Sequence, residues 1–390
     1  MFLDVDHFKE INDTFGHSCG DFLLVQVTQR IQKSLRSADF VARMSGDEFI
    51  IILERYEDID DLYMIADKII NTMAAPFDDE KREKQFSISV SIGIAIFEEG
   101  QTKEKLMGNA DVAMYEAKNK GRNRFVLYEK HMAEDLKHYL EIKSYIIEAL
   151  QKESFYMLCQ PKYDTESNQI NGFEILLRMR DTEGETILPD VFIKTAEKSG
   201  QIVDIDKWMI THAIEKISQL KDLPIPKFSV NISAKSISDD SFIDILFSAL
   251  EKYNVNGSVL EVELTENIML QYDEHLKATL QKLKNNGIEL SIDNFGSGYC
   301  SVHHLQSLPI RALKIDRSHV LNITSSESAK KIVEAIIKLG HTYHYKVIAE
   351  GVETKEQLKI LKALKCDTIQ GYLYSKPIAF DEIRNFCIEC

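Results

Sequence analysis

The segment ELSIDNFGSGYCS (residues 289–301) decides the fold of the C-terminal half of the chain. An apolar, strand-like run ends at Asp293 and Asn294, and two closely spaced glycines then break the pattern. A continuous apolar run bounded by turn residues is typical of a strand that is buried on both faces. A carboxylate at the end of such a strand is expected to take part in binding or catalysis.

Six further runs of the same kind follow one another in the chain, and each carries a polar group. NGFEILLRM carries Glu174, KFSVNIS reaches Asn231, VLEVELTE contains Glu263 and Glu266, RALKID contains Lys314, KVIAEG reaches Glu350, and CDTIQG reaches Gln370. Amphipathic helical segments alternate with these runs, which predicts a parallel βα barrel. The carboxyl ends of barrel strands converge on one face, where active sites lie.

Carboxylates gathered at one barrel mouth repel one another unless cations lie between them. Oxygen-only ligand sets suit Mg²⁺, Mn²⁺ or Ca²⁺ rather than zinc. The residues therefore predict a divalent-metal site, with Lys314 placed for a metal-bound water or a substrate phosphate. The alternative, that these side chains are only helix caps and loop turns, stays open for each residue taken alone.

The composition limits the classes of function. A chain of 390 residues with 44% hydrophobic and 28% charged residues predicts two soluble globular domains. A formal charge of −15 argues against nucleic-acid or anionic-membrane binding, which need a basic face. No apolar run approaches the ~20 residues of a membrane span. Among the six cysteines only Cys387 and Cys390 have CxxC spacing, and no second pair accompanies them, which indicates reduced thiols and a cytoplasmic protein.

The N-terminal half alternates strand-like and helix-like segments. Residues 40–53 predict two strands joined by a turn at Ser-Gly-Asp, and residues 85–97 predict another strand. Residues 105–125 predict a helix that stops near Gly121. Residues 130–152 contain neither Pro nor Gly and predict a connecting helix, or alternatively the first helix of the second domain.

The second half resembles the EAL family of cyclic di-GMP phosphodiesterases. The resemblance rests on CQPK, GFEILLR, VNISA, ELTE, DNFGSGY, LKID, AEGVET and QGYLYSKP, in that order. It implies a (βα)8-type, TIM-like barrel that hydrolyses cyclic di-GMP to pGpG with two Mg²⁺ or Mn²⁺ ions. The implied ligands are Glu174, Asn231, Glu263 and Asp293 for one ion, and Asp293, Asn294 and Glu350 for the other. The other implied roles are Lys314 and Gln370 near the nucleophilic water, Glu266 at the loop after Phe295, Arg178 at a phosphate and Gln160 near a guanine.

The chain departs from the family pattern at two positions of the barrel. The family has Asp-Asp-Phe-Gly where this chain has Asp293-Asn294-Phe295-Gly296, so the second ion loses one negative ligand. Ile175 replaces an alanine, which is a milder change. The barrel therefore has an alternative function, that of a catalytically impaired receptor or signalling module that binds cyclic di-GMP.

The first half is similar to the GGDEF family of diguanylate cyclases, through LDVDHFKEINDTFGHSCGD, SGDEF, SIGIA and ADVAMYEAKNKGRNR. The implied fold is a nucleotidyl-cyclase-like α/β sandwich. The implied roles are Asp4 and Asp47 for Mg²⁺ with the Val5 carbonyl, Glu48 in the transfer, Asn12 and Asp21 for guanine, Lys118 and Arg122 for phosphates, and Arg36 and Asp39 as an inhibitory cyclic di-GMP site. Ser45 replaces the family's first glycine. The start of the family's first strand and the helix before it are missing, so we expect one edge and one face of this core to be exposed.

These expectations combine into one domain plan. We expect an incomplete GGDEF domain over residues 1–128, a connecting helix over 129–152 and an EAL domain over 153–390. The GGDEF domain is expected to be degenerate or regulatory, with GTP as a possible ligand, and cyclase activity is the less favoured alternative. Both domain types commonly self-associate, which favours a homodimer.

Overall fold

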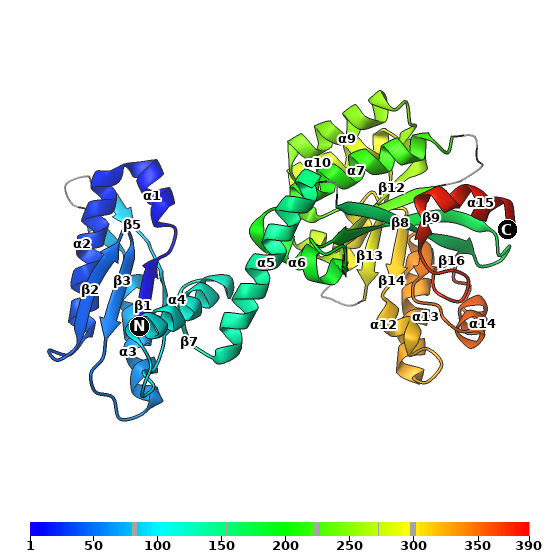
Figure 1. Ribbon diagram of the computed structural model, residues 1–390. Helices are drawn as coiled ribbons and strands as arrows, with labels where there is room; N and C mark the ends of the chain where they lie inside the picture. Colours follow the sequence, from blue (N-terminus) through cyan, green and yellow to red (C-terminus); the bar gives the residue numbers. More distant parts are fainter. Residues whose placement is uncertain are drawn as a thin grey trace. The chain divides into compact units, whose positions relative to one another are not determined.

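The computed structural model describes residues 1–79, 84–152, 154–221, 223, 227–271, 273–296 and 302–389. Contacts divide the chain into two compact units, Met1–Leu140 and Glu141–Cys390 (Figure 1). The division falls inside one long helix, α5 (Lys130–Lys152), over residues that the sequence predicted to be helical. Ile142, Ile146 and Ala149 of this helix belong to the hydrophobic core of the second unit.

The first unit is built on a sheet with the strand order β2-β3-β1-β6-β7. Its strands are β1 (Phe2–Val5), β2 (Phe40–Ser45), β3 (Glu48–Ile52), β6 (Val90–Ile94) and β7 (Arg124–Leu127), with a separate pair β4 (Phe77–Asp79) and β5 (Lys84–Phe86). Its helices are α1 (Phe8–Phe15), α2 (His17–Ser34), α3 (Ile59–Ala74) and α4 (Lys103–Asn119). The expected hairpin over residues 40–53 is confirmed, and so is the helix that ends before Gly121.

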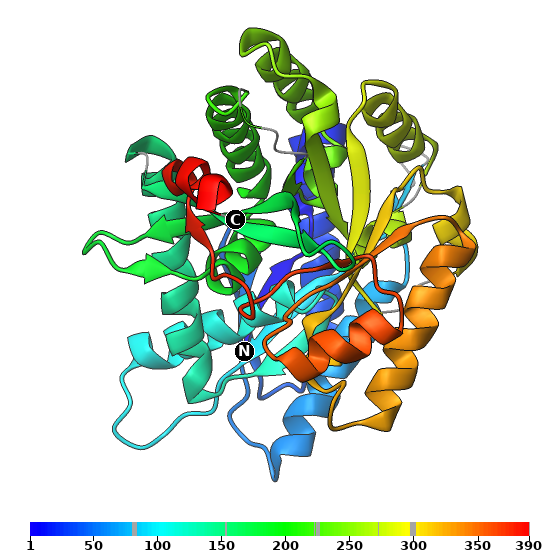
Figure 2. The ribbon, with the colours of Figure 1, turned by 90° about the vertical axis from the view of Figure 1, so that its right-hand side faces the viewer.

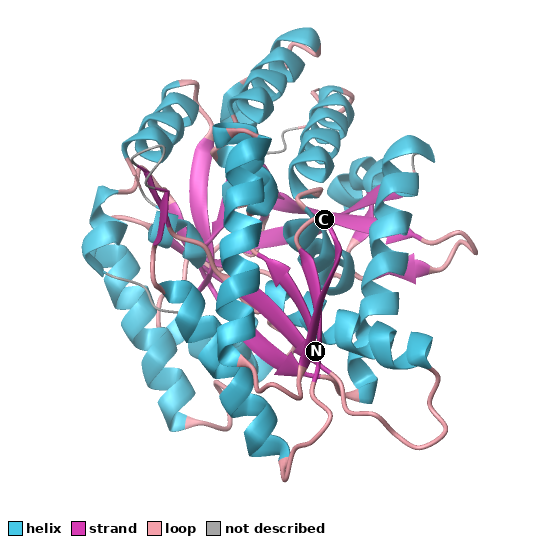
Figure 3. Ribbon diagram, turned by 90° about the vertical axis from the view of Figure 1, so that its left-hand side faces the viewer, coloured by secondary structure: helices cyan, strands magenta, loops and turns pink. Residues whose placement is uncertain are grey.

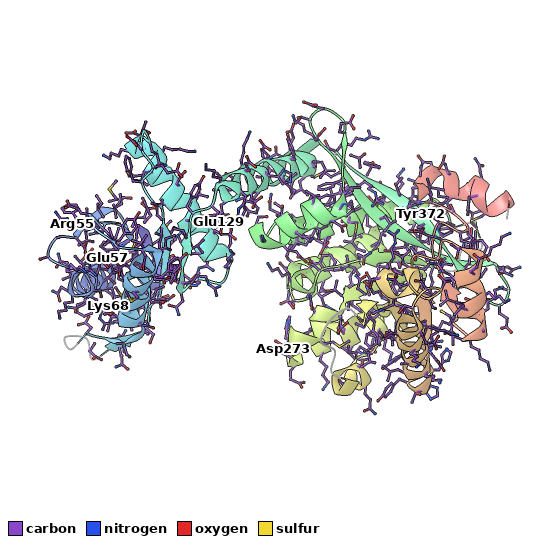
Figure 4. All side chains as sticks on the ribbon, turned by 90° about the horizontal axis from the view of Figure 1, so that it is seen from below. Arg55, Glu57, Lys68, Glu129, Asp273 and Tyr372 are labelled. Carbon is purple, nitrogen blue, oxygen red and sulfur yellow. The ribbon has the colours of Figure 1, made fainter. Side chains whose placement is uncertain are left out.

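Two helices, α2 and α3, bury the core on one face of this sheet. Phe49 and Ile51 of β3 pack there with Leu23 of α2 and Ile69 of α3. The two helices also contact each other, and Lys68, labelled in Figure 4, donates from Nζ to the Ser34 carbonyl at 3.0 Å.

The helix α4 packs closely against β6, and the glycine of SIGIA permits this approach. A Cβ on Gly93 would lie 1.9 Å from the Ala110 carbonyl oxygen and 2.2 Å from the Met114 nitrogen. These distances are far below van der Waals contact, so only glycine fits at this position. Figure 3 shows the strands in magenta against the cyan helices.

The sequence expectation for residues 85–97 was partly wrong, because the run contains two strands. β5 pairs with β4, whereas β6 pairs with β1. Between them, Ser89 binds Asp6: its carbonyl accepts from the Asp6 N–H at 2.9 Å and its hydroxyl donates to Asp6 Oδ2 at 2.6 Å. The apolar pattern alone did not reveal this polar anchor.

Part of the sheet's second face is apolar and exposed. Phe40, Met44, Ile52 and Phe97 are each more than half exposed. A cavity of about 630 Å³ lies along these residues, between the sheet and α4.

The second unit is a closed barrel of strands surrounded by helices (Figure 2). Its strands are β8 (Phe155–Asp164), β9 (Ile170–Arg180), β11 (Phe228–Asn231), β12 (Leu260–Thr265), β13 (Glu289–Phe295), β14 (Ala312–Ile315), β15 (Lys346–Ala349) and β16 (Thr368–Ile369), with β10 (Thr186–Ile187) and β17 (Ile378–Ala379) at the edges. Its helices are α6 (Pro189–Ser199), α7 (Ile202–Ser218), α8 (Ala234–Ile237), α9 (Asp240–Lys252), α10 (Glu274–Asn285), α11 (Val302–Ser307), α12 (Arg317–Leu321), α13 (Glu327–Thr342), α14 (Lys355–Ala363) and α15 (Ile383–Glu389). Short 3₁₀ helices are η1 (Gly257–Val259), η2 (Glu266–Gln271) and η3 (Phe380–Glu382).

The TIM-like barrel is confirmed, but it is not entirely parallel. The strands β9 and β11 to β16 pair in parallel, whereas β8 runs antiparallel to both β9 and β16 and closes the barrel. Only a short turn connects β8 to β9, and a parallel neighbour needs a crossover of a dozen or more residues. The β8–β9 hairpin therefore forces one strand to run in the opposite direction.

Among the described residues, no helix combines the length and the apolar character that crossing a bilayer requires.

Candidate functional site

The polar residues at the ends of the barrel strands gather at one mouth. Glu174, Asn231, Glu263, Asp293 and Lys314 lie on β9, β11, β12, β13 and β14. Glu350 directly follows β15, and Gln370 directly follows β16. Parallel pairing places Asn231 beside Glu263, because the two residues are register partners. The structure thus brings the barrel residues expected from the sequence together.

The Lys314 ammonium lies in the middle of the four carboxylates. Its nitrogen is 2.6 Å from Glu350 Oε1, 3.2 Å from Asp293 Oδ1 and 3.3 Å from Glu174 Oε2. It also contacts Glu263 Oε2. The side chain is fully buried, so no solvent screens these contacts.

Three amide side chains complete the polar cluster. Asn231 donates to Glu174 Oε1 at 2.7 Å. Gln370 donates to Glu174 Oε2 at 2.7 Å and to Gln160 Oε1 at 3.1 Å. Both oxygens of Glu174 are therefore held by neutral donors in addition to Lys314.

The electrostatics of this cluster follow from burial and charge. Burial alone would lower the pKa of Lys314, but the surrounding carboxylates raise it well above its ordinary value. Burial raises the pKa of Glu350 to about 8, although Lys314 opposes the shift. Burial would also raise the pKa of Glu263, but Lys162 and Lys314 together lower it to about 2. Burial and the nearby Glu263 charge raise the pKa of Glu174.

Asn294 lies in a bulge of β13, where the register against β14 shifts between Ile292 and Phe295. Its φ is 55°, in the left-handed region, which asparagine and aspartate tolerate better than other non-glycine residues. Its amide donates to Asp293 Oδ2 at 3.1 Å. An aspartate here would instead place a second carboxylate against Asp293.

Glu266 lies where η2 begins and is buried. Its Oε2 accepts from the Gly296 N–H at 3.1 Å. Its Oε1 is also buried, without a hydrogen-bond partner in the described ranges. Glu266 thus touches the start of the loop that it was expected to steady, while residues 297–301 of that loop lie outside the described residues.

A cavity of about 320 Å³ opens beside the carboxylates. Arg178, Asn231, Asp293 and Asn294 line it together with Asp206 of α7. The Arg178 guanidinium donates to the Leu177 carbonyl at 2.8 Å. A phosphate-sized group in this cavity would therefore meet both a cation and the acidic cluster.

Asp206 is a site residue that the sequence did not indicate. It is buried, and its Oδ2 accepts from the Ser233 N–H at 2.9 Å and from the Ser236 hydroxyl at 2.7 Å. These bonds fix the turn that follows Asn231. Burial raises the pKa of Asp206 to about 6.

Lys162 and Glu261 were also missed. Lys162 lies 2.6 Å from Glu263 Oε1 and 4.0 Å from Glu261 Oε2, and all three residues are buried. The available signal was a lysine directly after CQP in a strand-like run, and a glutamate two residues before Glu263. Residues two apart in a strand share a face, so Glu261 had to point into the barrel with Glu263.

The donor set fits a divalent cation. It consists of four carboxylates and the amide oxygens of Asn231 and Asn294, which are the oxygen ligands that Mg²⁺ and Mn²⁺ prefer. Asp293 Oδ1 is buried without a hydrogen-bond partner, although the Lys314 ammonium is 3.2 Å away. In the ranges that the structure describes, no three His, Cys, Asp or Glu side chains surround one metal-sized position. The Lys314 ammonium lies where the carboxylates meet.

The first unit brings Asp4, Asp47 and Glu48, the residues expected for Mg²⁺ and the transfer, close to one another. Asp4 and Glu48 are register partners on β1 and β3, and the Val5 N–H donates to the Asp47 carbonyl in the turn before β3 at 3.3 Å. Ser45 donates to Glu48 Oε2 at 2.9 Å, so its extra side chain binds an expected site residue.

The two expected phosphate-binding cations of this unit contact acids. Lys118 pairs with Asp4 at 2.8 Å, and Arg122 Nε lies 4.0 Å from Asp6 Oδ1. The Lys118 ammonium would have to share or leave Asp4 to meet a nucleotide phosphate, whereas the Arg122 contact is long and its side chain is 46% exposed.

Asn12 and Asp21, which were expected to bind guanine, lie on α1 and α2. Asn12 Oδ1 is buried and has no hydrogen-bond partner in the part of the chain described. A Cβ on Gly20 would lie 2.0 Å from this oxygen, so glycine provides its space.

The expected inhibitory pair lies in the turn between α2 and β2. The Arg36 N–H donates to Asp39 Oδ2 at 2.9 Å, and the Asp39 N–H donates to the Arg36 carbonyl at 3.0 Å. The backbone of the pair therefore forms a local turn closed by the Asp39 carboxylate.

Comparison with known proteins identifies both units. The model of the EAL domain matches residues 145–377, and the model of the diguanylate cyclase GGDEF domain matches residues 1–124. The bifunctional diguanylate cyclase/cyclic di-GMP phosphodiesterase MucR of Pseudomonas aeruginosa is 34% identical over 98% of this chain and 56% of its own length. The signaling protein YkoW of Bacillus subtilis is 35% identical over 100% of this chain and 49% of its own length.

A solved structure, "PaMucR Phosphodiesterase, c-di-GMP complex", matches with a TM-score of 0.59 and 31% identity, over 62% of this chain and 99% of that chain. The chain spans about half the length of the curated relatives it matches. The residues matched by the EAL model, 145–377, lie within the second unit, which is the barrel. The protein therefore belongs to the EAL domain family and carries a GGDEF domain ahead of its EAL domain.

Proposed function

We propose that the EAL barrel hydrolyses cyclic di-GMP to linear pGpG with the help of divalent cations. The observation that carries this proposal is the set of buried carboxylates held around Lys314 at the mouth of the barrel. Relatives named cyclic di-GMP phosphodiesterase and the related structure in complex with c-di-GMP support the choice of substrate.

Two ions, Mg²⁺ or Mn²⁺, are proposed at the mouth. Glu174, Asn231, Glu263 and Asp293 would hold one ion, and Asp293, Asn294 and Glu350 the other. When bound, such ions lower the pKa of a water molecule and offset negative charge on the phosphodiester.

The chain's own side chains orient the reacting groups. Arg178 lines the cavity and would bind a substrate phosphate. Gln370 and Gln160, which bond to each other, would meet the water and a guanine edge. Hydrolysis forms one new P–O bond from water and breaks one P–O bond of the ring, and the released 3′ oxygen takes up a proton. The buried Lys314 ammonium contacts all four mouth carboxylates and would lie beside these events.

Asn294 favours a second candidate, a cyclic di-GMP receptor without turnover. Its amide supplies one ligand oxygen but no negative charge. Its Nδ2 donates to Asp293, so this carboxylate has a hydrogen-bond donor where a second cation would otherwise bind. The GGDEF unit is proposed as regulatory, because its expected phosphate-binding cations, Lys118 and Arg122, contact the chain's own acids. GTP binding to this unit and a homodimer remain part of the proposal.

The test is incubation of the purified full chain with cyclic di-GMP and Mn²⁺, followed by chromatographic separation of the products. The parent should release pGpG, and Glu174→Ala should release none. Retention of unchanged cyclic di-GMP on the parent, with no pGpG at any Mn²⁺ concentration, would favour the receptor.

A further inference from the structure

Lys162 is a buried charge that the proposed reaction does not use. It lies on β8, is 3% exposed, and is 2.6 Å from Glu263 Oε1. Its second acid, Glu261, is 4.0 Å away on the same strand as Glu263. A buried ammonium is costly without such partners, so the contact to Glu263 is a built feature of the barrel interior.

Two lysines divide the carboxylate of Glu263 between them. Lys314 contacts Oε2 and is shared with three other acids of the mouth. Lys162 contacts Oε1, and its other acid is Glu261. A cation at the mouth would compete with Lys314 for the mouth acids. It would not compete with Lys162 for Glu261, because Glu261 is not one of the mouth acids.

The charge balance shows that Lys162 does not make the interior repel cations. Five carboxylates (Glu174, Glu261, Glu263, Asp293 and Glu350) face two ammonium groups in the contacts of Lys162 and Lys314. Three negative charges remain in excess when all five acids are ionised, and two remain when Glu350 is protonated. The interior therefore stays attractive to divalent ions with Lys162 in place.

We propose that Lys162 is a positioning residue for Glu263, which it holds by Oε1 so that Oε2 alone faces the mouth of the barrel. This inference rests on the proposed function, in which Glu263 is a metal ligand. Without Lys162, Oε1 loses its partner, and the carboxylate is free to turn both oxygens toward Lys314. Glu263 is then lost as a ligand, and metal binding weakens.

The test is calorimetric titration of Mn²⁺ into the cation-free full chain, for the parent, Lys162→Met and a control. The control is Lys227→Met, because Lys227 also pairs with a glutamate, Glu289, and that pair includes none of the mouth acids. Lys162→Met should weaken Mn²⁺ binding at least tenfold, and Lys227→Met should leave it within twofold. In a Glu263→Gln background, adding Lys162→Met should cause no further loss.

The sign of the change separates positioning from simple charge repulsion. Removing a positive charge would by itself tighten Mn²⁺ binding, so unchanged or tighter binding in Lys162→Met overturns the proposal. A loss that persists in the Glu263→Gln background also overturns it. If Lys162→Met does not fold, the double variant K162M/E261Q removes both buried charges of this pair. It should bind Mn²⁺ at least tenfold more weakly than the single variant Glu261→Gln. Equal Mn²⁺ binding by these two variants overturns the proposal. Absence of Mn²⁺ binding to the parent would instead contradict the metal site of the proposed function.

Discussion

Replacing Lys314 by methionine should strongly destabilise the cation-free barrel. Methionine has nearly the length of the lysine stem, so packing changes little while the charge disappears. Four carboxylates then share a buried site without their common ammonium. Removing one partner of a buried ion pair costs about 3–5 kcal/mol, because the remaining charge has no compensation.

The loss should depend on pH in a defined direction. Burial already raises the pKa of Glu350 to about 8, and that of Glu174 is also raised, with Lys314 opposing both shifts. Without Lys314, these acids bind protons more strongly in the folded than in the unfolded chain. Stability of the variant should therefore fall as the pH rises from about 4.5 through 8.

Thermal unfolding of the barrel in EDTA and in excess Mn²⁺ measures this effect. For a unit of this size, 3–5 kcal/mol corresponds to a Tm lower by about 6–20 °C. Mn²⁺ should restore most of the loss, because it replaces the missing positive charge. The control Lys227→Met removes a partly exposed pair and should cost no more than about 1 kcal/mol. A Lys314→Met barrel that unfolds in EDTA within 2 °C of the parent would refute the reasoning.

Two further predictions concern Asp206 and Gly93. Burial raises the pKa of Asp206 to about 6, so ionising this carboxyl costs stability as the pH rises from about 4 to 6. Asp206→Asn should flatten this part of the curve of stability against pH. A curve identical to that of the parent would contradict the raised pKa of Asp206. Gly93→Ala places a methyl group 1.9 Å from the Ala110 carbonyl oxygen and should destabilise the first unit by more than about 1–3 kcal/mol, measured by urea unfolding. The control Gly108→Ala, whose methyl group meets nothing within 4 Å, should not destabilise it. Equal effects of the two substitutions would count against the close packing of α4.

The sequence predicted the barrel and its mouth because strand periodicity and strand-end polarity are local signals. Seven apolar runs ending in polar groups required no knowledge of distant contacts, and the structure brings Glu174, Asn231, Glu263 and Asp293 together as expected. The reversed direction of β8 was not visible, because its apolar pattern is the same in either orientation.

The contacts that depend on three-dimensional closeness were beyond the sequence. Lys314 was expected near a water or phosphate; its contacts with Glu174, Glu263 and Asp293 on three strands, and with Glu350 after β15, could not be predicted. Lys162 and Asp206 were missed because each acts on a residue far away in the chain, Glu263 and Ser233. The left-handed backbone of Asn294 likewise depends on the bulge between β13 and β14.

The most direct test of the central claim compares the parent with Asn294→Asp for cyclic di-GMP hydrolysis across Mn²⁺ concentrations. Aspartate tolerates the left-handed backbone of residue 294, so the exchange changes charge and leaves the fold intact. The account predicts pGpG from both proteins, with half-maximal activity at a Mn²⁺ concentration at least tenfold lower in Asn294→Asp, because the second ion gains a carboxylate. Release of no pGpG by either protein, although both bind Mn²⁺ and cyclic di-GMP, would contradict it.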